Sequence, residues 1–225
     1  MGKVTIQKHT TLNPIQLIGE EAGICYGSDT SDPEKNYKRG LQNLKDGHGR
    51  TFEFPQVYMT IEGYSARFMR ELYTHIGGAP TRLQASTRYI NYNDFDVIIP
   101  KSLDTDRKKE IYNDAINQIR VSFRELLNLD VPKEDIANIL PLGMESKMVE
   151  RTNLRNLIDM SHQRECARAY WEFREFMQDL KKALSEYSEE WKYIVDNYFK
   201  PKCELFGYCT EKFSCGRYPQ KYWFL

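Results

Sequence analysis

Residues 52–80, FEFPQVYMTIEGYSARFMRELYTHIGGAP, combine two hydrophobic periods within a single stretch. Apolar and polar side chains alternate over residues 52–65, which predicts a strand, and Pro55 belongs at its start or at a sheet edge. Residues 66–75 predict a helix, and the following Gly77, Gly78 and Pro80 end it sharply. The chain is therefore expected to contain strands and helices in close succession.

Further elements are predicted on the C-terminal side of this stretch. Residues 88–100, RYINYNDFDVIIP, are rich in Tyr, Ile and Val and predict a strand with a short apolar run. From Asp106 onward the hydrophobic period becomes 3.6, which predicts an amphipathic helix. The apolar face of this helix is expected to contain Ile111, Ala115, Ile119, Phe123 and Leu126 or Leu127.

The C-terminal half is predicted to be mainly helical. Residues 130–132 resemble a helix N-cap followed by proline, opening a short helix that Pro141 closes. A long helical region is expected over residues 152–187, and a shorter helix over residues 191–199. The candidate core positions of the long region are Leu154, Leu157, Ile158, Ala167, Trp171, Phe176 and Leu180.

Two segments show no clear period. Residues 28–50 mix Gly, Asp, Pro and Lys and are expected to form a surface loop, and the last 25 residues are irregular and rich in aromatic residues and Cys. The chain shows no solenoid repeat, low-complexity tract or Gly/Ser linker. We therefore expect one folded domain over residues 1–225, with an irregular Cys-rich tail from about residue 200.

Composition narrows the class of protein. The 225 residues include 32 Lys and Arg against 32 Asp and Glu, which excludes a strongly basic nucleic-acid scaffold and an acidic disordered tail. The hydrophobic share is 40%, and much of it comes from 15 Tyr and 11 Phe. This hydrophobic share is slightly low for a globular chain, so we expect either burial in subunit contacts or a large polar site.

Location is predicted from what the sequence lacks. No run of about 18 apolar residues indicates a membrane helix, and the N-terminal residues form no apolar signal region. Five cysteines are an odd number in a long chain, which argues against a disulfide framework and favours a reducing compartment. A cytoplasmic location without membrane association is the resulting prediction.

Residues 74–92, THIGGAPTRLQASTRYINY, are the first candidate site. Arg82 and Arg88 lie there among Thr and Ser hydroxyls and the amide of Gln84, and arginine is suited to bidentate phosphate contacts. The alternative is a solvated turn in which Ser and Thr cap backbone groups. Composition alone leaves both interpretations open.

The helix expected from Asn153 is the second candidate site. Leu157, Ser161, Arg164 and Arg168 are spaced to share one helix face. Asn153 and Arg155 lie near the helix start, where free backbone donors favour anions. The alternative is a surface of ion pairs between these arginines and neighbouring glutamates.

The cysteines give little support for catalysis. Cys166 lacks a Gly-rich elbow and Cys25 lacks an evident base, so structural thiols are favoured over nucleophiles. Cys203, Cys209 and Cys215 are regularly spaced, but zinc sites usually contain a tighter pair and a fourth ligand. We therefore expect three reduced thiols rather than a metal site, with metal binding as the alternative.

The order of short motifs resembles that of flavin-dependent thymidylate synthases. In sequence they are CYGS at 25–28, H-x-x-x-F-E at 48–53, R-x-L-x-x-H at 70–75, Q-x-S-x-R-Y at 84–89, LP at 140–141 and N-x-R at 153–155. The resemblance covers the chain from Cys25 to about Arg174. It implies an α+β protomer with a mixed or antiparallel sheet and long helices.

The resemblance implies a dUMP site. Gln84, Ser86 and Arg88 match the second half of the family signature, whose residues hold dUMP, and Arg164 matches an arginine that reaches the pyrimidine. Ser86, Arg88 and Arg164 are thereby implied to be catalytic. The family's phosphate arginine ahead of the LP motif is Ala137 here, and Lys147 is a candidate replacement.

The resemblance also implies an FAD site. The residues that match flavin contacts of the family are Ser28, His48, Glu53, His75, Asn153 and Arg155. The arginines that flank the family histidine are Thr74 and Ile76 here, and an insertion of about two residues follows. Arg82 is a hypothetical replacement for part of that charge.

The implied reaction converts dUMP to dTMP. The methylene group comes from 5,10-methylenetetrahydrofolate, and the hydride comes from FAD that NADPH reduces. The resemblance also implies a homotetramer whose active sites are shared between subunits. Two alternatives remain: a relative that binds flavin and modifies another pyrimidine nucleotide, and a non-catalytic module that binds RNA or a metal. Zero net charge weakens the RNA version.

Overall fold

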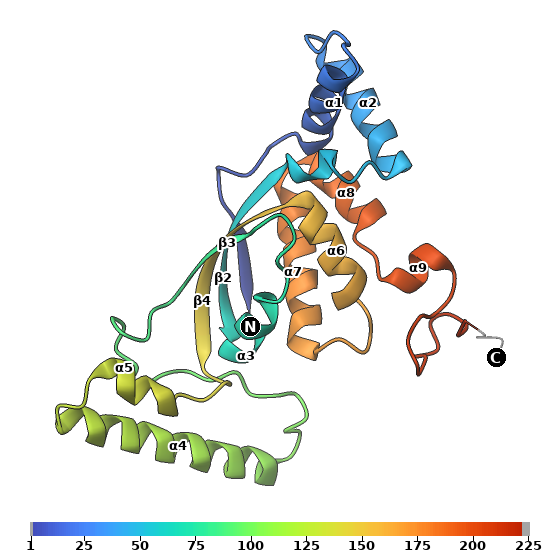
Figure 1. Cartoon of the computed structure of the whole chain (residues 1–225). Coiled ribbons are helices and arrows are strands. Elements are labelled where there is room, and N and C mark those ends of the chain that lie inside the picture. Colours follow the sequence, from blue (N-terminus) through green and yellow to red (C-terminus); the bar gives the residue numbers. More distant parts are fainter. Residues whose placement is uncertain (1, 222–225) are drawn as a thin grey trace.

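The computed structural model describes residues 2–221 and shows an α+β fold around one antiparallel sheet (Figure 1). The strand order is β1-β2-β4-β3, so β3 lies at an edge. The strands are β1 (Lys3–Ile6), β2 (Gln56–Ser65), β3 (Thr81–Gln84) and β4 (Glu145–Asn153). Helix α3 (Ala66–Leu72) follows β2 directly, which confirms the succession of strand and helix predicted over residues 52–75. The strand begins later than predicted, at Gln56, because residues 51–53 form a 3₁₀ turn.

One face of the sheet packs on the main hydrophobic core. Val57, Met59 and Ile61 point inward from alternating positions of β2 and are fully buried. They pack with apolar side chains of α3, α6 (Leu154–Arg164), α7 (Trp171–Tyr187) and α8 (Glu189–Tyr198). The alternation in sequence is thus the pattern expected of a sheet with one buried face.

The opposite face of the sheet carries polar and partly exposed side chains. Tyr58, Thr60 and Glu62 of β2 are half-buried, and Val149 of β4 is 38% exposed. Leu83 on β3 is 73% exposed. Figure 1 shows α6 and α7 together on the other side of the sheet. The sheet edge at β3 therefore presents the apolar side chain of Leu83 to solvent.

The prediction of a surface loop over residues 28–50 is wrong for most of that segment. Helix α2 (Pro33–Asp46) begins at the N-cap Asp32, whose side chain accepts from two backbone N–H groups. It packs on α1 (Pro14–Cys25) so closely that a Cβ at Gly19 would lie 1.7 Å from the Asn36 carbonyl oxygen. The overlooked signals were the Asp-Pro start and Gly47 in the left-handed C-cap position.

Helix α4 (Asp106–Asn128) confirms the predicted amphipathic helix, and Figure 1 places it with α5 (Lys133–Ile136) at the end of the sheet opposite the α1–α2 pair. Its buried residues are Ile116 and Phe123. The predicted face was partly wrong, because Ile111 is 56% exposed and Ala115 is exposed.

Residues 88–100 do not form the predicted strand. Asn91 accepts a hydrogen bond from the backbone of Asn93, a local turn that competes with strand pairing. Tyr92 and Phe95 instead pack into the second hydrophobic cluster beneath α4. The apolar residues of this segment therefore anchor a loop.

The long helical region predicted over residues 152–187 is two helices, α6 and α7, separated by residues 165–170. Arg168 therefore lies outside α6 and does not share the helix face predicted for it. Ala167 is exposed and Trp171 is half-buried, so neither is a core residue, whereas the other five predicted core positions are buried.

The C-terminal tail is largely irregular, as predicted, but begins with the short helix α9 (Lys202–Phe206). Its last four residues, 222–225, lie outside the described part of the chain. The single-domain organisation stays a prediction. No helix among residues 2–221 combines the length and the apolar character needed to cross a membrane.

Candidate functional site

The junction between β4 and α6 positions the predicted N-x-R residues. Asn153 is buried, and its Oδ1 caps α6 by accepting from the backbone N–H of Asn156 at 2.9 Å. The turn between α3 and β3 packs against Asn153. Gly78 in this turn has φ +67, and a Cβ there would lie 1.8 Å from Asn153 Nδ2. Asn153 is thus held in place by the helix cap and by close contact with the glycine turn.

Arg155 lies on the exposed side of the same junction. Its Nη1 donates to Glu53 Oε1 at 2.6 Å, and its side chain is 49% exposed. The segment that contains His48 passes beside it, because a Cβ at Gly49 would lie 3.5 Å from the Arg155 guanidinium. Arg50 also approaches Glu53, at 3.6 Å. The structure therefore brings the segment that contains His48 and Glu53 next to Arg155, which lies about 100 residues later in the sequence.

His75 and Arg164 form the next group along α6. Arg164 Nε donates to His75 Nε2 at 2.8 Å, and its Nη1 donates to Glu71 Oε2 at 3.1 Å. The Arg164 guanidinium also lies 4.5 Å from the centre of the Phe173 ring. Three fixed partners therefore hold this guanidinium in one orientation.

His75 is neutral at physiological pH. Burial and the adjacent positive charges of Arg164 and Arg82 lower its pKa to about 4, from the ordinary histidine value of about 6.5. The neutral ring leaves Nε2 free to accept from Arg164. Its edge-to-face contact with Phe173, at 5.4 Å between ring centres, fixes the ring plane.

Arg82 is not available for the predicted flavin-phosphate contact. Its side chain is only 4% exposed and forms an ion pair with Glu150 at 3.0 Å. The same Nη2 donates to the His75 carbonyl oxygen at 2.7 Å. The hypothesis that Arg82 replaces a missing phosphate contact is therefore corrected: this arginine faces the sheet interior and secures the turn that carries His75.

The predicted dUMP residues lie at the end of β3 and just beyond it, at the exposed sheet edge. Gln84 donates from Nε2 to Ser146 Oγ at 3.1 Å, and Ser86 Oγ accepts from the backbone N–H of Arg88 at 3.2 Å. Arg88 is 63% exposed and pairs with Glu134 at 2.8 Å. The three side chains thus share one short segment with few tertiary contacts.

Two predicted residues remain apart from these groups. Ser28 is exposed in the loop after α1, where its backbone N–H donates to the Gly23 carbonyl. Lys147, the candidate replacement for a phosphate arginine, lies on β4 and pairs with Glu62 at 2.7 Å. Ala137 lies in the 3₁₀ turn Ala137–Ile139, near the α4–α5 end of the molecule.

Sequence reasoning missed the residues that support the site. Glu71 and Phe173 orient Arg164, and Glu150 fixes Arg82. A signal for Glu150 did exist: it shares the strand parity of Met148 and Thr152, both buried, so it had to point into the core. The contacts of Glu71 and Phe173 depend on tertiary packing.

Stability is expected to depend on the protonation of His75. Because its pKa is about 4 in the folded chain, the unfolded chain binds the proton first as the pH falls below about 6.5. The stabilising contribution is therefore complete above that pH and is lost progressively toward pH 4. Thermal melts of His75→Gln should show a smaller loss of Tm between about pH 7 and pH 5 than wild type.

Glu150 acts in the opposite direction and serves as an internal comparison. Burial raises its pKa to about 7 despite the Arg82 charge, so the folded chain binds a proton before the unfolded chain does. Its contribution to stability therefore grows as the pH falls from about 7 toward 4.5. Glu150→Gln should consequently lose more Tm on acidification than wild type, and equal slopes in all three proteins would contradict both assignments.

Comparison with known proteins identifies a family. Residues 7–188 match the family model described as thymidylate synthase complementing protein. A flavin-dependent thymidylate synthase of Pyrococcus abyssi is 30% identical over 224 residues, covering 94% of this chain and 91% of the relative. One from Halobacterium salinarum is 31% identical and covers 79% of this chain and 88% of the relative.

Solved structures agree on the fold. The crystal structure of thymidylate synthase X from Helicobacter pylori with FAD and dUMP has a TM-score of 0.68 at 20% identity. The superposition covers 89% of this chain and 100% of the Helicobacter pylori chain. The fold and the family model confirm the resemblance that the motif order indicated, and the chain belongs to the flavin-dependent thymidylate synthase family.

Proposed function

We propose that this chain converts dUMP to dTMP by reductive methylation, with 5,10-methylenetetrahydrofolate as carbon donor and NADPH as reductant of FAD. The family match over residues 7–188 carries the proposal. The relatives from Pyrococcus and Halobacterium are named flavin-dependent thymidylate synthases. The solved Helicobacter structure was obtained with FAD and dUMP.

The residues around Arg155 fit FAD in charge and exposure. Arg155 is half-exposed, Arg50 is 87% exposed, and His48 is exposed on the adjacent segment. These groups can contact a diphosphate at the start of α6, where the helix dipole also favours an anion. Bound FAD would supply the hydride for the final reduction. We assign His48, Glu53, Asn153 and Arg155 to this site, with Ser28 and His75 as further contacts.

The nucleotide is assigned to Gln84, Ser86 and Arg88, together with Arg164. The exposed guanidinium of Arg88 can exchange its surface partner Glu134 for an anionic or carbonyl oxygen. Arg164 is already oriented by His75 and Glu71, so little reorganisation is needed when it contacts the pyrimidine. Both arginines would stabilise negative charge that develops on the pyrimidine oxygens.

A homotetramer with shared sites is part of the proposal. Gln84, Ser86 and Arg88, three of the four residues assigned to dUMP, lie at an exposed sheet edge, and Leu83 next to Gln84 is 73% exposed. Burial of this edge by another subunit would remove apolar surface from water and enclose the nucleotide. Light scattering at micromolar concentration should give the mass of four chains, whereas a monomer contradicts the shared site.

Activity can be tested with the complete chain. The purified protein should show the visible spectrum of oxidised flavin, or acquire it with FAD, and should release tritium from C5-labelled dUMP when folate and NADPH are present. Flavin binding without tritium release would favour a relative that acts on another pyrimidine nucleotide. A protein that takes up no FAD would support a binding module instead.

The cytoplasmic location is also a proposal, based on the odd number of cysteines.

A further inference from the structure

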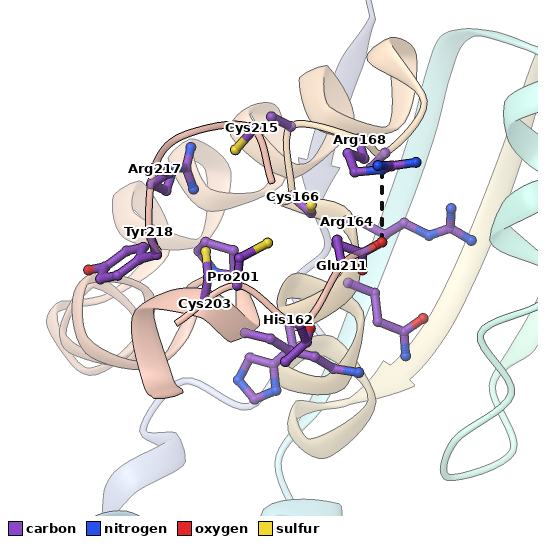
Figure 2. Close-up of a pocket in the computed structure, with 16 residues that line it drawn as sticks. His162, Arg164, Cys166, Arg168, Pro201, Cys203, Glu211, Cys215, Arg217 and Tyr218 are labelled. Atoms are coloured by element: carbon purple, nitrogen blue, oxygen red, sulfur yellow. Dashed lines mark ion pairs between the residues drawn. The ribbon is translucent and has the colours of Figure 1, made fainter. Parts of the chain in front are cut away.

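Four cysteines line one cavity next to the end of α6, and Arg164 also contributes to its lining. Cys166 lies in the connection between α6 and α7, Cys203 lies on α9, and Cys209 and Cys215 follow in the C-terminal tail. All four line a cavity of about 510 Å³. Figure 2 shows the sulfur atoms of Cys166, Cys203 and Cys215 around the same space. Cys166 is thus the fourth cysteine that the regular spacing of the tail triplet lacked.

The tail has almost no core of its own. Within residues 202–221, Cys209 is the one buried residue that the structure describes. Leu205, Phe206 and Phe213 are each about half exposed or more. Short segments without a hydrophobic core usually depend on a disulfide or a metal for a defined structure. The described cysteines form no disulfide, so their thiols are available as metal ligands.

The charges around the cavity favour an anionic thiolate cluster. Arg168, Lys202 and Arg217 line the same cavity as the cysteines. A Zn²⁺ ion held by four thiolates carries two net negative charges, which these cations would offset. Arg168 also donates to the backbone carbonyl of Phe213 at 3.0 Å, so it already joins the α6–α7 connection to the tail.

The four cysteines reach the cavity from three separate segments: the α6–α7 connection, α9 and the residues that follow α9. A cation bound between their sulfur atoms would join these segments. Cys25, the fifth cysteine, is exposed at the end of α1 and does not line the cavity.

We propose that Cys166, Cys203, Cys209 and Cys215 bind one Zn²⁺ ion that ties the C-terminal tail to the α6–α7 connection. Among residues 2–221, no three His, Cys, Asp or Glu side chains are yet arranged to hold a metal ion, so the tail closes inward when the ion binds. Gly207 and Gly216, both with positive φ, form the turns that border Cys209 and Cys215. The thiols release their protons as the four Zn–S bonds form.

The ion would also stabilise the end of α6. Arg164 is the last residue of this helix and lies two residues before Cys166. In Figure 2 its guanidinium points away from the cysteines, and its partners His75 and Glu71 lie outside the cavity lining. Zinc would therefore have a structural role, separate from contact with the nucleotide.

Metal analysis of the complete chain tests the site. Protein purified under reducing conditions without a His tag should contain about one Zn²⁺ per chain. Cys166→Ser and Cys215→Ser should lower the zinc content to near zero, whereas Cys25→Ser should keep it. Cys215 is exposed, so its variant stays informative if Cys166→Ser fails to fold. Zinc loss in Cys25→Ser, or its retention in both cavity variants, would overturn the proposal.

Thiol titration of the native protein separates zinc binding from the other states of the cysteines. In the zinc form Cys25 reacts at once, and the other four thiols become reactive only after a chelator removes the ion. Thiols that appear only after a reductant is added would indicate disulfides, and five immediately reactive thiols would indicate free cysteines. Either result contradicts the proposed site. Chelation should also lower the Tm of wild type but leave that of Cys215→Ser unchanged.

Discussion

Arg88→Ala is expected to abolish dTMP formation while leaving the fold intact. The removed guanidinium is one of two that we assign to the pyrimidine oxygens, and loss of such a donor typically costs about 2.7–4 kcal/mol of transition-state stabilisation. The corresponding fall in turnover is about 10²–10³-fold. In the chain, Arg88 is 63% exposed and its ion partner is the exposed Glu134, so the free energy of unfolding should hardly change.

The matched control is Arg107→Ala. Arg107 is also an exposed arginine, 73% accessible, and pairs with Glu110 on the surface of α4. It lies outside the predicted motifs, so tritium release from C5-labelled dUMP should stay at the wild-type rate. Equal Tm values of the two variants would show that the difference in activity does not come from a difference in stability. Near-normal turnover in Arg88→Ala would refute its assignment to the nucleotide.

Glu150→Met is expected to destabilise the fold by about 3–5 kcal/mol, the typical cost of breaking a buried ion pair. Arg82 would then remain 4% exposed with no carboxylate partner, and a guanidinium cannot escape this by losing its proton. Arg82→Met should cost less. The remaining Glu150 can bind a proton, because burial already raises its pKa to about 7 with Arg82 present.

The double variant Arg82→Met/Glu150→Met completes the comparison. Replacement of a buried ion pair by apolar side chains of similar volume is often neutral or stabilising. Urea unfolding should therefore find the double variant more stable than Glu150→Met alone. Its dTMP formation should still fall, since Arg82 also donates to the His75 carbonyl oxygen. If the loss of unfolding free energy in the double variant equalled the sum of the losses in the two single variants, Arg82 and Glu150 would not be a coupled pair.

Local sequence signals predicted some elements and failed for others. The alternation predicted over residues 52–65 appears as β2 from Gln56 onward, and the 3.6 period from Asp106 appears as α4, because each pattern matches a buried face. The Tyr- and Ile-rich residues 88–100 carried a similar signal but form a loop. Tyr92 and Phe95 of this segment are buried against α4, and such packing easily overrides β-propensity.

The site divides in the same way. The motif order located Asn153, Arg155, Gln84, Ser86 and Arg88 as candidates for anion and nucleotide binding. It could not indicate that Arg82 is buried, because nothing local to residues 74–92 points to Glu150 on a neighbouring strand. It also left the tail cysteines without a partner, since Cys166 reaches the same cavity only through the folded chain.

The sequence by itself determined the kinds of residue, the motif order that indicates the family, and the elements whose hydrophobic period is strong. These follow from local conformational preference and from which face of an element must be buried. The tertiary structure decided which charged groups stay available. Sheet register places Arg82 opposite Glu150, whereas Arg88 extends from the exposed edge. Desolvation and distance, which no local pattern contains, separate the structural arginine from the one we assign to the nucleotide.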